Sequence, residues 1–211
     1  MEEGSHVDAK PTVFIVDDDQ AVRKALSLLI KSAGLEVETH TSAQAFLETY
    51  DPARPGCLVL DVRMPGMSGP ELQEQLSARG ITIPVIIITG HGDVPIAVRA
   101  LKKGAVDFIQ KPFDGEVLLE RVRQAIELDA QMRREQARRA EVAARLARLT
   151  PREHQVMGLL VAGRGNKEIA LALGLSRKTV DIHRAHIMMK LGIDSLVELL
   201  RMGLAHQTDR K

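Results

Sequence analysis

The sequence is poor in aromatic residues and cysteine and has no long apolar run. It has no tryptophan, one tyrosine and four phenylalanines, which argues against proteins that stack single-stranded nucleic acid on aromatic side chains. Its one cysteine, Cys57, cannot form an internal disulfide, and its apolar neighbours indicate a buried thiol in a reducing, cytoplasmic setting. No apolar run approaches the roughly 20 residues of a membrane span, and the first residues lack a secretory signal. We therefore expect no membrane partner.

Charge is unevenly distributed along the 211 residues, although the formal net charge is only +1. Residues 1–126 carry 13 Lys and Arg against 18 Asp and Glu, and residues 127–149 carry 6 against 4. Residues 150–211 carry 10 against 6, together with four of the seven histidines. An acidic front and a basic rear indicate two modules with different partners, and the basic one suits nucleic acid.

Short apolar runs alternate with helical patterns over residues 11–126. The runs at Leu58–Leu60 and Val85–Ile88 have no polar member, as in strands buried on both faces of a parallel sheet. We expect further strands over 12–16, 35–40 and 106–110, and helices over 20–33, 41–50, 70–79, 94–103 and beyond Asp114. This alternation predicts an α/β fold with a flavodoxin-like five-stranded parallel sheet, whose crevice lies between the first and third strands.

Chemically useful side chains stand where the predicted strands end. Asp17 and Asp18 follow the first strand, and Asp61 ends the third. Thr89 ends the fourth strand, and Lys111 follows the fifth. Since the carboxyl ends of parallel strands meet at one rim, the three carboxylates would repel one another unless a cation neutralised them, and Mg²⁺ is the natural candidate. A carboxylate there can act as a nucleophile and become an acyl phosphate.

The enzyme alternative is a haloacid-dehalogenase-like phosphatase, which also uses an aspartyl nucleophile at a strand end. Such enzymes need a second aspartate two positions later, whereas Asp61 is followed by Val62 and Arg63. Asp19 stands at that spacing from Asp17, but the residues after it do not continue the motif. The residues therefore favour a phosphoryl acceptor over a hydrolytic enzyme.

With these strand ends, residues 11–126 resemble the receiver domain of two-component response regulators. The resemblance implies a regulator rather than an enzyme, in which a sensor histidine kinase phosphorylates Asp61. It implies that the carboxylates of Asp17, Asp18 and Asp61, with the backbone carbonyl of Arg63, hold Mg²⁺.

The resemblance also assigns residues to the phosphoryl group itself. Thr89 matches the hydroxyl that binds it, and Lys111 matches its counter-charge. The Lys111–Pro112 bond is expected to be cis, which an X-Pro bond adopts at small cost. Phe108 falls at the aromatic switch position, where it would fill the space that Thr89 leaves on moving toward the phosphate.

Residues 127–149 are expected to form a helical linker. No glycine or proline occurs between Glu116 and Pro151, and good helix formers dominate. Apolar residues up to Ile126 can dock on the receiver sheet. Beyond them a seven-residue apolar spacing would allow a short coiled coil between two copies, although two charged residues interrupt it. We favour the alternative, a solvated helical spacer.

Residues 150–211 carry the start signals of four helices. Thr150-Pro151-Arg152-Glu153 is a capping box with proline at the first helical position. Asn166 is expected to cap the second helix, and Gly174-Leu175-Ser176 forms the turn before a third helix over 177–191. A second capping box begins the fourth. Two helices joined by a short glycine-containing turn predict an all-α helix-turn-helix domain.

The third of these helices has an unusual exposed face. On a helical wheel its core face includes Val180, and the opposite stripe includes Ile182 with Lys178, Ala185 and Met189. Apolar side chains on an exposed stripe suit a DNA major groove, where thymine methyl groups are read. Asp181 flanks the stripe and could accept a hydrogen bond from cytosine N4. The alternative is a small helical bundle with a basic surface.

The segments 149–153 (LTPRE), 166–170 (NKEIA) and 178–184 (KTVDIHR) resemble the LuxR-type helix-turn-helix. With a receiver in front, the chain resembles the NarL/FixJ class of transcription factors, and segments 90–93 (GHGD) and 105–108 (AVDF) resemble its FixJ branch most. The resemblance implies phosphate contacts from Lys167, Lys178, Thr179 and Lys190, with bases read near Asp181, Ile182 and Ala185.

The function implied is a switch in transcription. Phosphorylation of Asp61 would promote a homodimer that binds paired half-sites of double-stranded promoter DNA and activates transcription with RNA polymerase. The alternative function is a receiver-gated adaptor whose helical domain binds a protein, for instance RNA polymerase, rather than DNA.

Overall fold

The computed structural model describes residues 10–90 and 94–208, except the side chains of residues 94–97 and 203–208. The chain divides after Arg133 into two units, each with hydrophobic core residues of its own. Within the described ranges, no helix is both long and apolar enough to cross a membrane.

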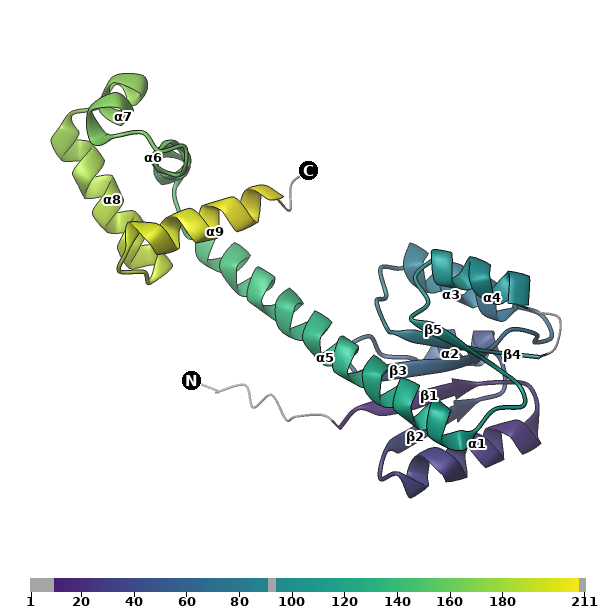
Figure 1. Cartoon of the computed structure of the whole chain (residues 1–211). Coiled ribbons are helices and arrows are strands. Elements are labelled where there is room, and N and C mark those ends of the chain that lie inside the picture. The colour runs from purple at the N-terminus through teal and green to yellow at the C-terminus, as the bar shows by residue number, and fades with distance from the viewer. Residues whose placement is uncertain (1–9, 91–93, 209–211) are drawn as a thin grey trace. The chain divides into compact units, whose positions relative to one another are not determined.

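The first unit is built on a five-stranded parallel sheet (Figure 1). Its strands are β1 (Thr12–Val16), β2 (Glu36–His40), β3 (Gly56–Asp61), β4 (Val85–Thr89) and β5 (Asp107–Gln110). Their order, β2-β1-β3-β4-β5, confirms the predicted flavodoxin-like topology.

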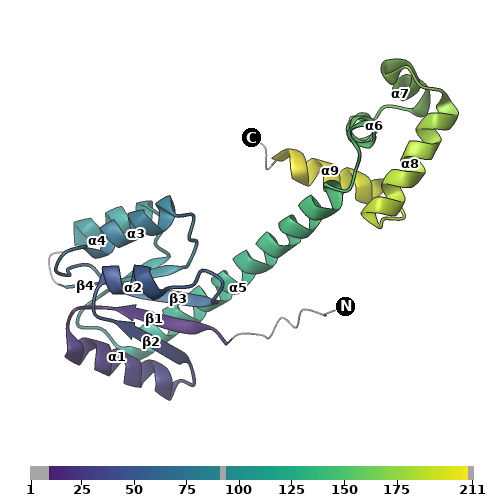
Figure 2. The same ribbon diagram turned by 180° about the vertical axis from the view of Figure 1, so that it is seen from behind.

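Helices cover both faces of this sheet (Figure 1 and Figure 2). One face packs against α1 (Gln20–Ser32) and α5 (Gly115–Leu146), and the other against α2 (Ala43–Thr49), α3 (Gly69–Ala78) and α4 (Val94–Lys102). All residues of β1, β3 and β4 are buried, and successive side chains point to opposite faces. Phe14 and Leu58 therefore join one core, whereas Val13 and Val59 join the other.

Gly56 begins β3 at a close approach to β1. Its φ is +148°, and a Cβ there would lie 1.8 Å from the carbonyl oxygen of Thr12. Only glycine accommodates both this conformation and this contact. Its backbone N–H donates to Asp129 Oδ2 at 2.9 Å, so the start of β3 is also tied to α5.

Helix α5 docks on the first unit further than its apolar pattern predicts. That pattern ends at Ile126, but Asp129 is only 3% exposed, and Arg133 binds Asp129 at 2.8 Å. The Arg133 guanidinium also donates to the three backbone carbonyls of residues 52–54, at 2.6 to 3.1 Å. Polar contacts therefore continue the docking to Arg133, and the same helix runs on to Leu146.

In the second unit the end of α5 is followed by further helices. They are α6 (Pro151–Val161), α7 (Asn166–Leu173), α8 (Arg177–Leu191) and α9 (Leu196–Thr208). The capping box at the start of α6 is confirmed, because Thr150 accepts from the Glu153 N–H at 3.3 Å and Glu153 accepts from the Thr150 N–H at 2.7 Å. Their core joins all of these elements, through residues such as Leu146, Ile169 and Leu199.

The start of α7 differs from the prediction. Its N-cap is Gly165, so the expectation that Asn166 caps this helix is wrong. The Glu168 carboxylate reaches back to accept from the Gly165 N–H at 2.9 Å, which already satisfies this end of the helix. The side chain of Asn166 binds Asp181 and Arg184 on α8 instead.

Candidate functional site

Two of the predicted carboxylates lie at the ends of neighbouring strands. Val16 in β1 is paired with Leu60 in β3, so Asp17, which follows β1, lies beside Asp61, the last residue of β3. Asp17 is 2% exposed and Asp61 is 9% exposed. Burying two carboxylates together is costly unless positive charge lies with them.

Lys111 supplies that positive charge. Its Nζ lies 2.7 Å from Asp61 Oδ1 and 3.0 Å from Asp17 Oδ2. The pairing of β4 with β5 brings Lys111 to the same rim, where its backbone N–H donates to the carbonyl oxygen of Thr89 at 2.7 Å. The Lys111–Pro112 peptide bond is cis, as the resemblance implies.

The shared environment shifts two pKa values. Burial raises the pKa of Asp61 and the Asp17 charge adds to the rise, although Lys111 and the Arg63 N–H oppose it. Burial would lower the pKa of Lys111, but its hydrogen bonds to both carboxylates outweigh burial and raise it. The ammonium therefore stays charged at neutral pH. Perturbed pKa values in one cluster are typical of functional sites, and a carboxylate can act as a nucleophile.

Backbone donors hold the remaining oxygens of the two carboxylates. The Arg63 N–H donates to Asp61 Oδ2 at 2.7 Å, and the Asp19 N–H donates to Asp17 Oδ1 at 2.8 Å. Asp18 does not join this cluster, and its side chain is exposed. Among the residues that the structure describes, no three acidic, histidine or cysteine side chains gather closely enough to hold a metal ion.

The donor set nevertheless suits a small, hard cation. Asp17 and Asp61 both bind the Nζ of Lys111. The space between the two carboxylates therefore favours a positively charged group. Mg²⁺ prefers oxygen ligands and keeps several of its waters, so one or two carboxylates are enough to hold it. The backbone carbonyl of Arg63 would offer a ligand of the same kind. The residues present therefore fit Mg²⁺.

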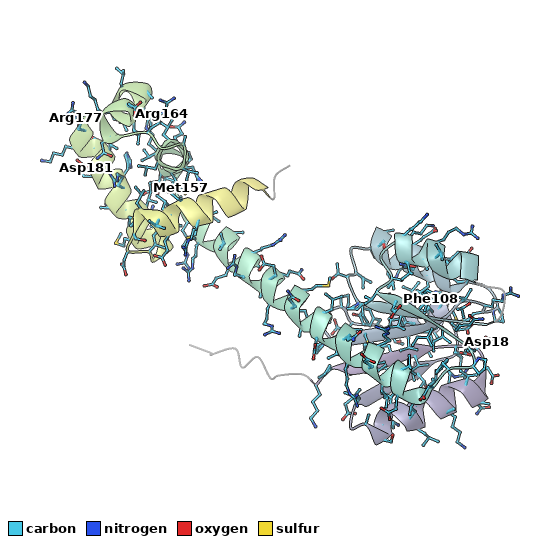
Figure 3. All side chains as sticks on the ribbon, in the orientation of Figure 1. Asp18, Phe108, Met157, Arg164, Arg177 and Asp181 are labelled. Atoms are coloured by element: carbon cyan, nitrogen blue, oxygen red, sulfur yellow. The ribbon has the colours of Figure 1, made fainter. Side chains whose placement is uncertain are left out.

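Thr89 and Phe108 lie on the paired strands β4 and β5. Thr89 is fully buried, and its hydroxyl donates to the carbonyl oxygen of Gly90 at 3.3 Å. Phe108, labelled in Figure 3, is half-buried against the core on the α2–α3–α4 face. Residues 91–93, which contribute to the resemblance to the FixJ branch, lie outside the described residues.

Sequence reasoning missed the contact of Gly69 with the candidate phosphoacceptor. Gly69 begins α3, and a Cβ there would lie 2.3 Å from the carbonyl oxygen of Asp61. Its N–H donates to the carbonyl oxygen of Val62 at 3.1 Å. The glycines and proline after Asp61 indicate a turn, but they do not show which glycine touches the strand.

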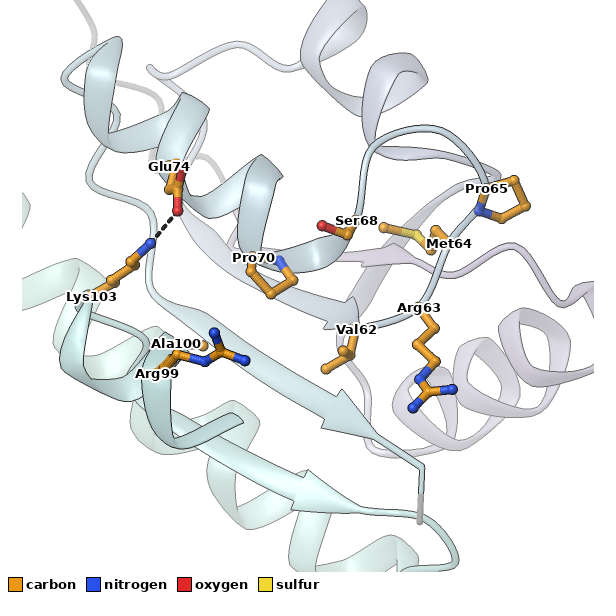
Figure 4. A pocket seen from close by; sticks show the side chains of 10 residues that line it. All are labelled: Val62, Arg63, Met64, Pro65, Ser68, Pro70, Glu74, Arg99, Ala100 and Lys103. Atoms are coloured by element: carbon orange, nitrogen blue, oxygen red, sulfur yellow. Dashed lines mark hydrogen bonds and ion pairs between the residues drawn. The ribbon is translucent and has the colours of Figure 1, made fainter. Parts of the chain in front are cut away.

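A cavity of about 600 Å³ opens beside the segment that follows Asp61 (Figure 4). Its walls come from that segment, from α3 and from the end of α4, and they include Val62, Met64 and Ala100. An ion pair between Glu74 and Lys103 joins α3 to the residue after α4 (Figure 4). No sequence pattern indicated this cavity, because its walls lie far apart in the chain.

Helix α8 exposes the predicted stripe. Ile182 is 47% exposed and Met189 is 71% exposed, while Val180 on the opposite face is fully buried. Lys178 and Ala185 are exposed as well. The structure thus confirms that apolar side chains of this helix face solvent.

The other candidate DNA contacts are placed near the start of α7 and α8. Lys167 is exposed in the first turn of α7. The Thr179 hydroxyl lies 2.8 Å from that of Ser176, the N-cap of α8. Asp181 is exposed and accepts a hydrogen bond from Asn166 of α7.

Lys190 is bound within the second unit. Its Nζ lies 2.6 Å from Glu153 Oε2, and Glu153 is 3% exposed. Burial would raise the pKa of Glu153, but hydrogen bonds from Lys190 and Thr150 outweigh it and lower the pKa to about 2. A contact of Lys190 with a DNA phosphate would have to compete with this ion pair.

Comparison with protein families identifies both parts of the chain. Residues 13–123 match the response regulator receiver domain, and residues 147–203 match the bacterial regulatory proteins of the luxR family. The chain belongs to the response regulators that join a receiver to a LuxR-type DNA-binding domain, and it is a transcription-regulating response regulator. The adaptor alternative is not favoured.

Individual relatives agree with this assignment. The chain is 50% identical over 192 residues to the transcriptional regulatory protein FixJ of Azorhizobium caulinodans, covering 91% of each chain. It is 46% identical to nodulation protein W of Bradyrhizobium diazoefficiens, covering 95% of this chain and 89% of the relative.

Solved structures give the same result. The response regulator StyR is 48% identical, with a TM-score of 0.84, over 93% of this chain and 100% of that one. Full-length FixJ from B. japonicum is 43% identical, with a TM-score of 0.59, over 93% and 97%. Receiver domains generally bind Mg²⁺ for phosphorylation.

Proposed function

We propose that a sensor histidine kinase phosphorylates Asp61, and that this promotes homodimer formation and binding of α8 to double-stranded promoter DNA. There the dimer activates transcription with RNA polymerase. The observation that carries the proposal is the pair of buried carboxylates, Asp17 and Asp61, gathered around the Lys111 ammonium at the carboxyl end of the sheet. The protein acts in this proposal as a regulator that accepts one phosphoryl group, not as an enzyme.

In the transfer, a carboxylate oxygen of Asp61 forms a bond to phosphorus while the bond from phosphorus to the kinase histidine nitrogen breaks. The electron pair of that bond returns to the imidazole, which takes a proton from water. Lys111 offsets the charge that develops on the phosphoryl oxygens, and the Thr89 hydroxyl donates to one of them. When bound, Mg²⁺ supplies further positive charge there. Its ligands would be Asp17, Asp61 and the carbonyl oxygen of Arg63, and the exposed Asp18 would join them by turning its side chain toward the ion.

Phosphorylation then changes the packing of side chains on β4 and β5. Thr89 exchanges its bond to the Gly90 carbonyl for one to the phosphoryl group, and Phe108 fills the space left behind. Support comes from the burial of Thr89 and the half-buried packing of Phe108 on the adjoining strand. The outer face of these strands changes shape and favours a second copy.

DNA recognition is assigned to α8 and the first turn of α7. Exposed Ile182 and Ala185 contact base edges, and Asp181 accepts from a base amino group. The proposed phosphate contacts are Lys167, Lys178 and Thr179, with Lys190 adding one where its ion pair opens. The second unit is small, so affinity comes from two copies on paired half-sites.

The test is phosphorylation of the full chain by acetyl phosphate with Mg²⁺, followed on a phosphate-affinity gel and by DNA binding. We expect the wild type to be modified and to bind promoter fragments more tightly afterwards, because the phosphoryl group drives dimer formation. Asp61→Asn lacks the nucleophile and should show neither change. Asp51→Asn, an exposed aspartate before β3, is the matched control and should behave like the wild type. Stoichiometric modification of Asp61→Asn would disprove the assignment.

A further inference from the structure

Asn166 occupies a position where an N-cap is expected but uses its side chain elsewhere. Gly165 is the N-cap of α7, and Glu168 accepts the Gly165 N–H. The half-buried carboxamide of Asn166 instead crosses to α8. Its Nδ2 donates to Asp181 Oδ1, and its Oδ1 accepts from Arg184 Nη1 at 2.7 Å.

The carboxamide thus links a carboxylate and a guanidinium on one helix. Asp181 and Arg184 are three positions apart and share a side of α8. A carboxamide is the side-chain group that presents a donor and an acceptor at the same end. Both of its hydrogen bonds are to charged groups, which makes them the stronger kind. The orientation of the Asp181 side chain is therefore fixed from α7.

The fixed carboxylate keeps one oxygen for another donor. Asp181 lies in the N-terminal half of α8 and is labelled in Figure 3. Its Oδ1 is bound to Asn166, and its Oδ2 has no hydrogen-bond partner among the described residues. Asp181 is exposed and adjoins Ile182 of the apolar stripe. A carboxylate oxygen in that place can accept from the N4 amino group of cytosine in a major groove.

We propose that Asn166 is a positioning residue for sequence recognition, which holds the Asp181 carboxylate so that its second oxygen faces one base pair of each half-site. The inference rests on the proposed DNA-binding function. Two neighbouring residues of α7 then have different roles. Asn166 affects sequence preference through Asp181, whereas the exposed Lys167 affects affinity for any DNA sequence. Fixing a side chain before binding removes an entropy cost from the correct complex.

The experiment selects bound sequences from a randomised double-stranded DNA library with the phosphorylated full-length chain. Asp181→Ala should lose preference at one base pair of the half-site. Asn166→Ala should weaken preference at that same base pair by about 2- to 10-fold, the cost of ordering one side chain, and the double variant should match Asp181→Ala. Lys167→Ala, the control, should lower affinity equally for all sequences and leave the preference unchanged.

Asn166→Asp keeps the shape of the side chain and the acceptor for Arg184, but it replaces the donor to Asp181 with a carboxylate that repels it. It should lose at least as much preference at that base pair as Asn166→Ala, without a packing defect, and the added negative charge should also lower affinity for all sequences. Circular dichroism and thermal unfolding establish that each variant is folded. A uniform loss of affinity in both Asn166 variants, a change at a different base pair, or additive effects of Asn166→Ala and Asp181→Ala would overturn the inference alone. A wild type that selects no sequence would overturn the proposed function and this inference with it.

Discussion

Glu153 makes two separate stabilising interactions in the second unit. Its carboxylate completes the capping box of α6 and also neutralises Lys190 from α8. The resemblance implies that Lys190 contacts phosphate, whereas the structure commits its ammonium to a buried carboxylate. His186 also faces this group, with Nδ1 3.9 Å from Glu153 Oε1. A buried carboxylate that loses its cation is strongly destabilising.

Replacing Lys190 by methionine should therefore destabilise the second unit by about 3 kcal/mol at neutral pH. The folded pKa of Glu153, about 2, lies below its ordinary value of 4.5, so its contribution to stability is full above pH 4.5 and is lost as the pH falls toward 2. The defect should shrink over that same interval. Urea unfolding followed by helical circular dichroism measures both effects.

Lys178→Met, at an exposed position of the same helix, is the control and should change stability by less than about 0.5 kcal/mol. The double variant Glu153→Gln with Lys190→Met removes both charges and should recover part of the loss. Equal stability of Lys190→Met and the wild type at neutral pH would contradict the role given to this pair.

At the scale of elements, apolar periodicity predicts what is buried, but not what is held by polar contacts. The central strands β3 and β4 follow from apolar runs, whereas β2 and β5 contain polar residues. The alternation of strands with helices predicts the strand order, and the strand ends place Asp17, Asp61 and Lys111 at one rim. The exposure of Asp18 depends on the turn after β1, which no periodicity describes. Likewise, a cap rule selects Asn166, although Glu168 already satisfies that end of α7.

Helix α5 carries a testable case of polar docking. Arg133→Ala would remove the donors to the carbonyls of residues 52–54 and leave the buried Asp129 without its cation. We expect the first unit to lose about 3 kcal/mol of stability. The Gly56 N–H, which donates to Asp129, should exchange faster with deuterium.

The matched control is Arg138→Ala, on the same helix with a side chain that is 72% exposed. A pair this exposed contributes little, so unfolding and Gly56 exchange should stay close to the wild type. Unchanged exchange at Gly56 in Arg133→Ala would show that the apolar part of α5 alone anchors the helix.

At the scale of the whole molecule, the two units have separate cores and opposite charge, the first part acidic and the last part basic. In the proposed function, phosphorylation of Asp61 and contact with DNA therefore use different residues on different units. Because each unit folds around its own core, the residues that resemble a receiver and those that resemble a LuxR-type helix-turn-helix lie in separate segments of the sequence. Variants should be able to disable one task and leave the other intact.

Lys178→Ala provides the test of that separation. It should weaken binding to all DNA sequences and reduce the slope of log affinity against log salt by about 1, because one phosphate contact is lost. Phosphorylation by acetyl phosphate should be unchanged. Lys31→Ala, an exposed lysine of α1, removes the same charge from the first unit and should leave the slope as it is. An unchanged slope in Lys178→Ala would remove it from the phosphate contacts.

The burial of Cys57 has a practical consequence for work on this protein. Its side chain is fully buried in β3, and burial raises the pKa of the thiol to about 12, so maleimide reagents find almost no reactive thiolate in the folded chain. The sequence has no other cysteine, so thiol-reactive spin labels or fluorophores should hardly modify the folded native chain. A single engineered surface cysteine would then report on one chosen spot.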